Sequence, residues 1–185
     1  MFIQTESTPN PATLKFLPGK PVSDRGIVDF ASPEAAGGSL LAERLFAVDG
    51  VVGVMFGEDF ISVTKGGGEW QHLKPSLLGA IMDFYLSGAP VFRGDVGVSE
   101  DGEATEDDEV IQQIRELIDT RVRPAVAQDG GDIIFDRFDA GSGTVFLQMR
   151  GACSGCPSST LTLKSGIENL LRHYVPEVNG VEQVL

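Results

Sequence analysis

The sequence predicts an α+β protein made of two small domains joined by an acidic flexible linker. Its 185 residues, 42% of them apolar, are enough for two ordinary cores. Residues 1–94 and 109–185 each carry seven basic and ten acidic side chains, whereas residues 95–108 carry seven acidic and no basic ones. Such an acidic stretch repels itself and cannot bury a core. We therefore expect domains at 1–94 and 109–185, tethered by residues 95–108.

The first domain is expected to contain strands and two helices. Alternating apolar residues and turn formers predict strands at residues 2–5, 12–17, 51–56 and 60–64. Ser32 as N-cap, Pro33 in the first helical position and Glu34 near the positive end of the helix dipole predict that a helix begins there. A second helix is expected over 71–86, where apolar residues recur at helical spacing. No reactive centre is evident in this domain.

The second domain is expected to follow the order α-β-β-α-β. Apolar residues at helical spacing over 110–122 predict a helix that ends near Pro124 or about a turn later. Two strands joined by a glycine-rich turn, a helix that stops before Pro176 and a last strand follow; we place the strands at residues 133–138, 144–149 and 181–185.

The net charge of the chain limits the classes of partner that it is expected to bind. A formal net charge of −13 and a pI near 4.4 argue against nucleic acid and anionic membranes, which need clustered Lys and Arg. No apolar run approaches the roughly 20 residues that cross a bilayer, and the first residues lack the pattern of a signal peptide. We expect a bacterial cytoplasmic protein, with the mature form of a mitochondrial matrix protein as the alternative.

The two cysteines of the chain, Cys153 and Cys156, form a CxxC motif between a predicted strand and a predicted helix. In an unexported chain this spacing is typical of metal binding or redox chemistry rather than of a structural disulfide. Free backbone N–H groups and the helix dipole at this place are expected to lower the thiol pKa and favour thiolates. Because both chemistries need thiolates, the spacing alone leaves both open.

The number of ligands separates the alternatives further. Zinc and iron–sulfur clusters normally take about four protein ligands, so the pair is half of a site. A zinc site in one chain would need more ligands, and the only histidines are His72 and His173; His173 lies too far along its helix to reach back. No βαβ unit precedes the motif, which disfavours a thioredoxin-like dithiol. The Gly and Ser between the cysteines disfavour two purely apolar core thiols. Two CxxC loops related by a two-fold axis supply four thiolates, which fits one removable cubane cluster shared by two chains.

Other motifs are assigned to structure. Asp129-Gly130-Gly131-Asp132 is interpreted as a tight turn, because no glycine-rich run here is followed by Lys-Ser or Lys-Thr. Neither histidine has a catalytic motif around it, so we assign no catalytic residues and expect no enzyme.

The motifs of the second domain resemble those of the NifU C-terminal (Nfu) domain. They are Arg123-Pro124-Ala125-Val126, Asp129-Gly130-Gly131-Asp132 and the run from Gly151 through Cys153 and Cys156 to Glu168. The first domain resembles the N-terminal domain of two-domain Nfu proteins of bacteria and mitochondria. Its matching segments are Phe2-Ile3-Gln4-Thr5-Glu6, Thr8-Pro9-Asn10-Pro11 and Leu14-Lys15-Phe16.

This resemblance implies an iron–sulfur cluster scaffold or carrier. It implies a 4Fe-4S cluster held between two subunits by Cys153 and Cys156, a cluster-dependent homodimer, upstream cluster-assembly proteins as donors and apo iron–sulfur proteins as clients. The first domain, without cluster ligands, would modulate docking of clients. The alternative from a different class is a CxxC dithiol-disulfide oxidoreductase, and a third is a zinc-binding interaction module.

Overall fold

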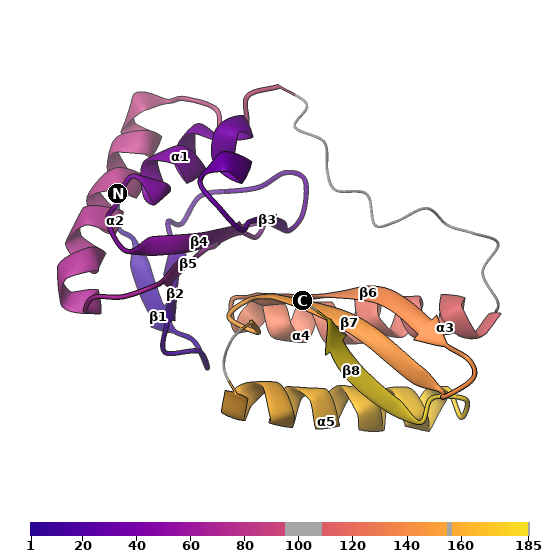
Figure 1. Ribbon diagram of the computed structural model, residues 1–185. Helices are drawn as coiled ribbons and strands as arrows, with labels where there is room; N and C mark the ends of the chain where they lie inside the picture. Colours follow the sequence, from indigo (N-terminus) through magenta and orange to yellow (C-terminus); the bar gives the residue numbers. More distant parts are fainter. Residues whose placement is uncertain (95–108, 155–156, 185) are drawn as a thin grey trace. The chain divides into compact units, whose positions relative to one another are not determined.

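The computed structural model describes residues 1–94, 109–154 and 157–184. The chain divides into two compact units, Met1–Val98 and Ser99–Leu185 (Figure 1). Each unit combines helices with a sheet around its own buried apolar cluster. The predicted α+β class and the two-domain organisation are therefore confirmed. The acidic stretch predicted as a linker, 95–108, lies outside the described residues.

The first domain is built on a five-stranded antiparallel sheet with the strand order β1-β2-β5-β4-β3. The strands are β1 (Gln4–Ser7), β2 (Thr13–Leu17), β3 (Val28–Phe30), β4 (Val51–Phe56) and β5 (Ile61–Lys65). Four of them lie within one or two residues of the predicted segments. Strand β3 is an addition that the sequence did not predict, since three residues are too few to show alternation.

Three helical segments complete this domain: the 3₁₀ helix η1 (Glu34–Gly38), α1 (Leu40–Phe46) and α2 (Trp70–Ser87). The predicted helix start at Ser32 is only partly right. The Ala35 N–H donates to Ser32 Oγ (3.4 Å), but the segment that follows is the 3₁₀ helix η1, whose cap position is Pro33. The α-helix starts later, where Ser39 Oγ accepts from the N–H of Ala42 (3.3 Å). Two glycines at the end of η1 have the low helix propensity that separates the two segments.

The second domain has the predicted order α-β-β-α-β. Its three-stranded sheet, in the order β6-β7-β8, joins an antiparallel pair to a parallel one. The strands are β6 (Gly131–Asp139), β7 (Thr144–Gly151) and β8 (Gly180–Val184). On β7, Val145, Leu147 and Met149 are buried while the residues between them are half-buried, so this strand directs alternate side chains into the core.

The first helical segment of this domain was predicted to end near Pro124 or about a turn later, and it ends about one turn later, at Gln128. It runs through α3 (Glu109–Leu117), the π turn η2 (Ile118–Val122) and α4 (Arg123–Gln128). Proline lacks an N–H and its ring clashes with the carbonyl four residues earlier. The wider π turn directly before α4 leaves Pro124 at the start of a new helical segment, where a proline is tolerated.

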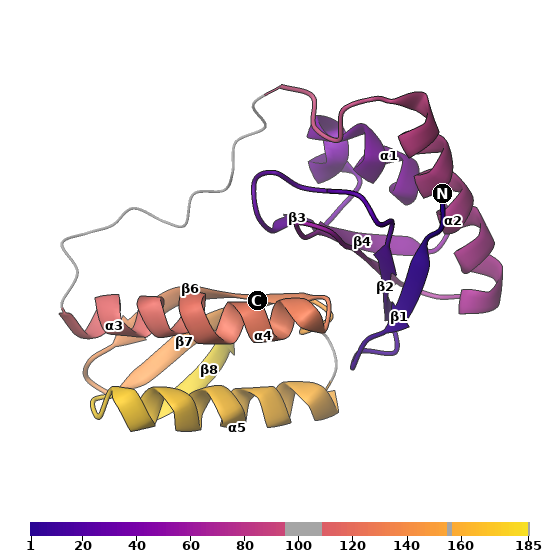
Figure 2. The same cartoon turned by 180° about the vertical axis from the view of Figure 1, so that it is seen from behind.

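Helix α5 (Pro157–Tyr174) follows the cysteine motif. Residues of α3, α4 and α5 all join the sheet in one buried cluster, so the helices cover the same face of the sheet (Figure 2). Among the described helices, none is long and apolar enough to span a bilayer.

Candidate functional site

Cys153 lies in a turn between the end of β7 and the start of α5. Gly151 adopts a positive φ of 59°, which turns the chain away from the strand. The Cys153 N–H then donates to the carbonyl of Arg150 (3.2 Å), and the Ser154 N–H donates to the carbonyl of Gly151 (3.1 Å). The predicted strand-to-helix position is thus confirmed for Cys153. Its predicted partner Cys156 lies outside the described residues.

Strand β6 begins directly against this turn. Gly131 pairs with Gly151 across the β6–β7 ladder, and the N–H of Ala152 donates to the carbonyl of Gly130 (3.1 Å). A Cβ at Gly131 would lie 2.2 Å from Cys153 Sγ and 3.0 Å from its backbone nitrogen. Only glycine fits here without displacing the cysteine. The tight-turn interpretation is right for Gly130, which has a positive φ of 76°, but it missed the contact that Gly131 makes with the thiol.

A buried ion pair holds the start of β6 to helix α4. Arg123 Nε and Nη2 donate to the two carboxylate oxygens of Asp132 at 2.9 and 3.1 Å. The Asp132 side chain is only 2% exposed, whereas the Arg123 side chain keeps 26% exposure. Arg123 also contacts Asp119, one helical turn earlier, at 3.3 Å. Burial alone would lower the pKa of Arg123, but hydrogen bonds and charge attraction from these two carboxylates raise it.

This pair corrects the interpretation of Asp132 as a residue of the turn. Two planar groups joined by two parallel hydrogen bonds fix the orientation of the strand start relative to the helix. Both residues belong to the motifs noted in the sequence. A separation of nine residues along the chain does not by itself predict that they form an ion pair.

The Cys153 thiol does not have the environment expected from the sequence. Its side chain is 7% exposed and joins the apolar core of the domain. Burial, with the nearby negative charges of Asp129 and Asp132, raises the pKa of Cys153 to about 12. The expectation of a lowered pKa is wrong for this residue, because burial outweighs a helix dipole that acts over little more than the first turn.

Neither histidine belongs to this turn. His173 is in the last turn of α5 and stacks edge-on against Tyr174, with ring centroids 4.9 Å apart. His72 belongs to the first turn of α2 in the other domain. Over residues 1–94, 109–154 and 157–184, no three His, Cys, Asp or Glu side chains are grouped in a way that could hold a metal ion.

Comparison with known proteins covers both domains. Residues 114–182 match the family model of the NifU-like domain, and residues 3–88 match that of the scaffold protein Nfu/NifU N terminal. The chain is 55% identical over 186 residues to "NifU-like protein 4, mitochondrial" of Arabidopsis thaliana, covering 99% of this chain and 66% of that protein. It is 52% identical over 187 residues to "NFU1 iron-sulfur cluster scaffold homolog, mitochondrial" of Homo sapiens, covering 100% of this chain and 72% of that protein.

One solved structure matches about half of the chain. The solution structure of a NifU-like protein from Saccharomyces cerevisiae, 24% identical, covers 51% of this chain and 87% of its own, with a TM-score of 0.46. The chain spans about two thirds of the length of the two named relatives. Matches of both domains and more than 50% identity over the whole chain show that it belongs to the family of Nfu-type, NifU-like proteins.

Proposed function

We propose that this protein is an iron–sulfur cluster scaffold and carrier, without enzymatic chemistry of its own. The family and the printed name of the human relative support the general role. The observation that carries the proposal is the turn around Cys153, whose position is fixed by the close contact with Gly131 and by the backbone hydrogen bonds on either side. A ligand held in place before the cargo arrives loses little conformational freedom on binding.

The cargo in this proposal is a 4Fe-4S cluster that Cys153 and Cys156 of two subunits hold together. Two CxxC turns supply the four thiolates that a cubane takes, and a two-fold axis brings identical turns face to face. Each subunit contributes half of the ligands, so separation of the subunits loosens the cluster. Client thiolates would then replace the cysteine thiolates on iron one at a time, with no change in the number of iron–sulfur bonds.

The division into domains belongs to the same proposal. We assign the Nfu-type N-terminal domain to residues 1–94, the linker to residues 95–108 and the cluster-binding domain to residues 109–185. A tether of this length lets the first domain hold a client close to the cluster and raises its effective concentration. Deleting residues 97–106 should slow transfer to a client without changing the cluster content; an unchanged transfer rate would argue against the tether.

The partners proposed are upstream cluster-assembly proteins and apo iron–sulfur clients, with a homodimer that forms around the cluster. The named relatives are mitochondrial proteins. They support the mitochondrial matrix, the alternative location given above, and give no support to the bacterial cytoplasm that the sequence led us to expect.

Anaerobic reconstitution tests the proposal directly. The full chain is incubated with iron and sulfide, and its absorbance spectrum, iron and sulfide content and mass in solution are measured. We expect about two iron and two sulfide per chain, a 4Fe-4S spectrum and a dimer. Cys153→Ala should lose all three, whereas Ser154→Ala, a change in the same turn, should keep them.

Other outcomes would replace the proposal. A colourless monomer that reduces insulin disulfides would favour the dithiol oxidoreductase. Tight zinc content without sulfide would favour the zinc-binding module.

A further inference from the structure

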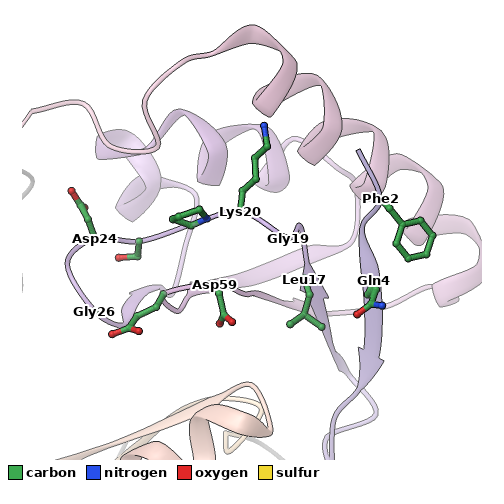
Figure 3. Close-up of a pocket in the computed structure, with 11 residues that line it drawn as sticks. Phe2, Gln4, Leu17, Gly19, Lys20, Asp24, Gly26 and Asp59 are labelled. Carbon is green, nitrogen blue, oxygen red and sulfur yellow. The ribbon is translucent and has the colours of Figure 1, made fainter.

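A hollow of about 870 Å³ opens on the surface of the first domain, far in sequence from the cysteines. It lies between the chain that follows β2 and the turn that joins β4 to β5 (Figure 3). Its lining combines three carboxylates with apolar side chains, among them Leu17 and Pro21. Such a mixture is typical of surfaces that bind a partner through an apolar contact and a few charges.

Two of the three carboxylates of the hollow have no ion-pair partner among the described residues. Glu58 and Asp59, in the turn between β4 and β5, are exposed, and within the described residues neither forms an ion pair. Asp24 has an 87% exposed side chain and lies 3.8 Å from Arg25 Nε. Asp24 is therefore paired with Arg25, which also donates through Nη2 to the carbonyl of Gly94 at 2.6 Å.

Lys20 is the one cation that lines the hollow, and it does not neutralise the carboxylates. Figure 3 shows the Lys20 side chain extending in the opposite direction from Asp59 and Leu17. Its ammonium lies 5.8 Å from the centre of the Tyr85 ring on α2, a cation–π distance. The hollow therefore keeps an excess of negative charge.

Apolar groups lie next to these charges. Phe2 is 79% exposed, and Leu17 is half-buried at the end of β2. Strand β1, which contributes Gln4, is at the edge of the sheet, so one side of its backbone has no neighbouring strand within this domain as described. Apolar side chains beside exposed carboxylates can offer a partner both contact area and charge complementarity.

The geometry points to a docking site for a basic segment of a partner protein, in which Lys or Arg stands next to an apolar or aromatic residue. The cationic groups would pair with Glu58 and Asp59, and the apolar side chain would cover Leu17 and Phe2. An anionic partner is disfavoured by the same carboxylates. The preference for a basic and apolar segment follows from the hollow alone. The further statement that this segment belongs to a cluster client or donor rests on the function proposed above.

The test uses the full-length, reduced chain without cluster, so it does not depend on cluster binding. A labelled peptide of alternating Arg and Leu is the probe, compared with an Arg–Ser peptide and a Glu–Leu peptide. We expect saturable binding of the Arg–Leu peptide, at least tenfold weaker binding of the other two, and amide NMR shifts confined to residues 2–4, 17–26 and 57–60.

Charge-reversed variants distinguish binding at the hollow from nonspecific electrostatic attraction to the acidic chain. Glu58→Lys with Asp59→Lys should weaken Arg–Leu binding at least tenfold. Asp49→Lys with Asp83→Lys makes the same change in net charge at exposed positions outside the hollow and should weaken it less than twofold. Equal losses in both variants, shifts outside the hollow, or no saturable binding would overturn the inference. Cluster content of both variants, measured separately, should equal that of the wild type, so a failure here leaves the carrier function untouched.

Discussion

Asp132 in the second domain and the pair Glu58 and Asp59 in the first have opposite environments. In the second domain, Asp132 is almost fully buried and both of its oxygens accept hydrogen bonds from Arg123. In the first domain, Glu58 and Asp59 are exposed beside a hollow, and no described cation pairs with them. A buried carboxylate without its cation would be costly, so the first arrangement fixes a structure. An exposed carboxylate costs little and remains available to a partner.

This difference matches the roles proposed for the domains. The region around Cys153 depends on close contacts that allow little variation, as the 2.2 Å approach at Gly131 shows. The hollow instead offers charge and apolar surface without a fixed geometry. We therefore expect changes near Cys153 to affect both stability and cluster binding, and changes in the first domain to leave cluster binding intact. Four predictions test this contrast, with stability measured for each domain by hydrogen exchange.

The largest effect is expected for Arg123→Met. Removing the cation leaves the buried Asp132 carboxylate unpaired, which costs about 3–5 kcal/mol for a fully buried pair. Because the Arg123 side chain keeps 26% exposure, we expect the free energy of unfolding of the second domain to fall by about 2–3 kcal/mol. The matched control is Arg172→Met, which breaks an exposed pair with Glu168 and should cost under about 0.5 kcal/mol. Equal effects of the two variants would mean that the Arg123–Asp132 pair is not structural.

Gly131→Ala is expected to have the next largest effect. The added Cβ overlaps Cys153 Sγ, and overpacking of this kind costs about 1–3 kcal/mol. We expect the second domain to lose about 2 kcal/mol and the reconstituted chain to lose most of its iron. Gly166→Ala in α5 adds the same methyl group to open space and should stabilise the helix slightly. Normal iron content in Gly131→Ala would contradict the positioning role of this glycine.

In the first domain, Ser39→Ala should destabilise that domain and leave cluster binding unchanged. Ser39 Oγ caps α1 and donates to the carbonyl of Val91 at 2.7 Å, so the loss should be about 1–2 kcal/mol. Ser32→Ala, which removes the weaker contact at the start of η1, should cost less than half as much. Both variants should bind iron and sulfide as the wild type does. A loss of cluster in Ser39→Ala would show that the domains are not independent in this respect.

The smallest effect is expected for the pH dependence of stability that Tyr85 contributes. Burial raises the pKa of Tyr85 to about 12, while an exposed tyrosine ionises near pH 10. The unfolded chain therefore releases this proton first, and the stability of the first domain should decline as pH rises from about 10 to about 12. Tyr85→Phe removes the hydrogen bond to the carbonyl of Pro21 and should be slightly less stable at pH 8, by about 0.5–1 kcal/mol. Its decline between about pH 10 and about pH 12 should be shallower than that of the wild type; parallel curves would refute the role of this group.

Much of the fold could be predicted because it depends on local patterns. The α2 helix and the β4–β5 hairpin have long apolar periodicity with a clear turn, and the structure places them within one or two residues of the prediction. Prediction was less successful where neighbouring signals competed. Ser32 and Ser39 are both good caps, and only the glycines between them decide which one begins the α-helix.

The sequence by itself determined the class of the protein and its two domains, and it predicted a site at the cysteine motif, because these follow from residue types and their spacing. Tertiary structure decided what surrounds Cys153. The contact with Gly131, the pair between Arg123 and Asp132, and the burial that raises the thiol pKa arise from segments that meet only in the folded chain. The hollow at Glu58 and Asp59 was decided in the same way, since its residues come from separate parts of the sequence. Spacing along a chain carries no record of which distant side chains will become neighbours, and charge, burial and close packing depend on those neighbours.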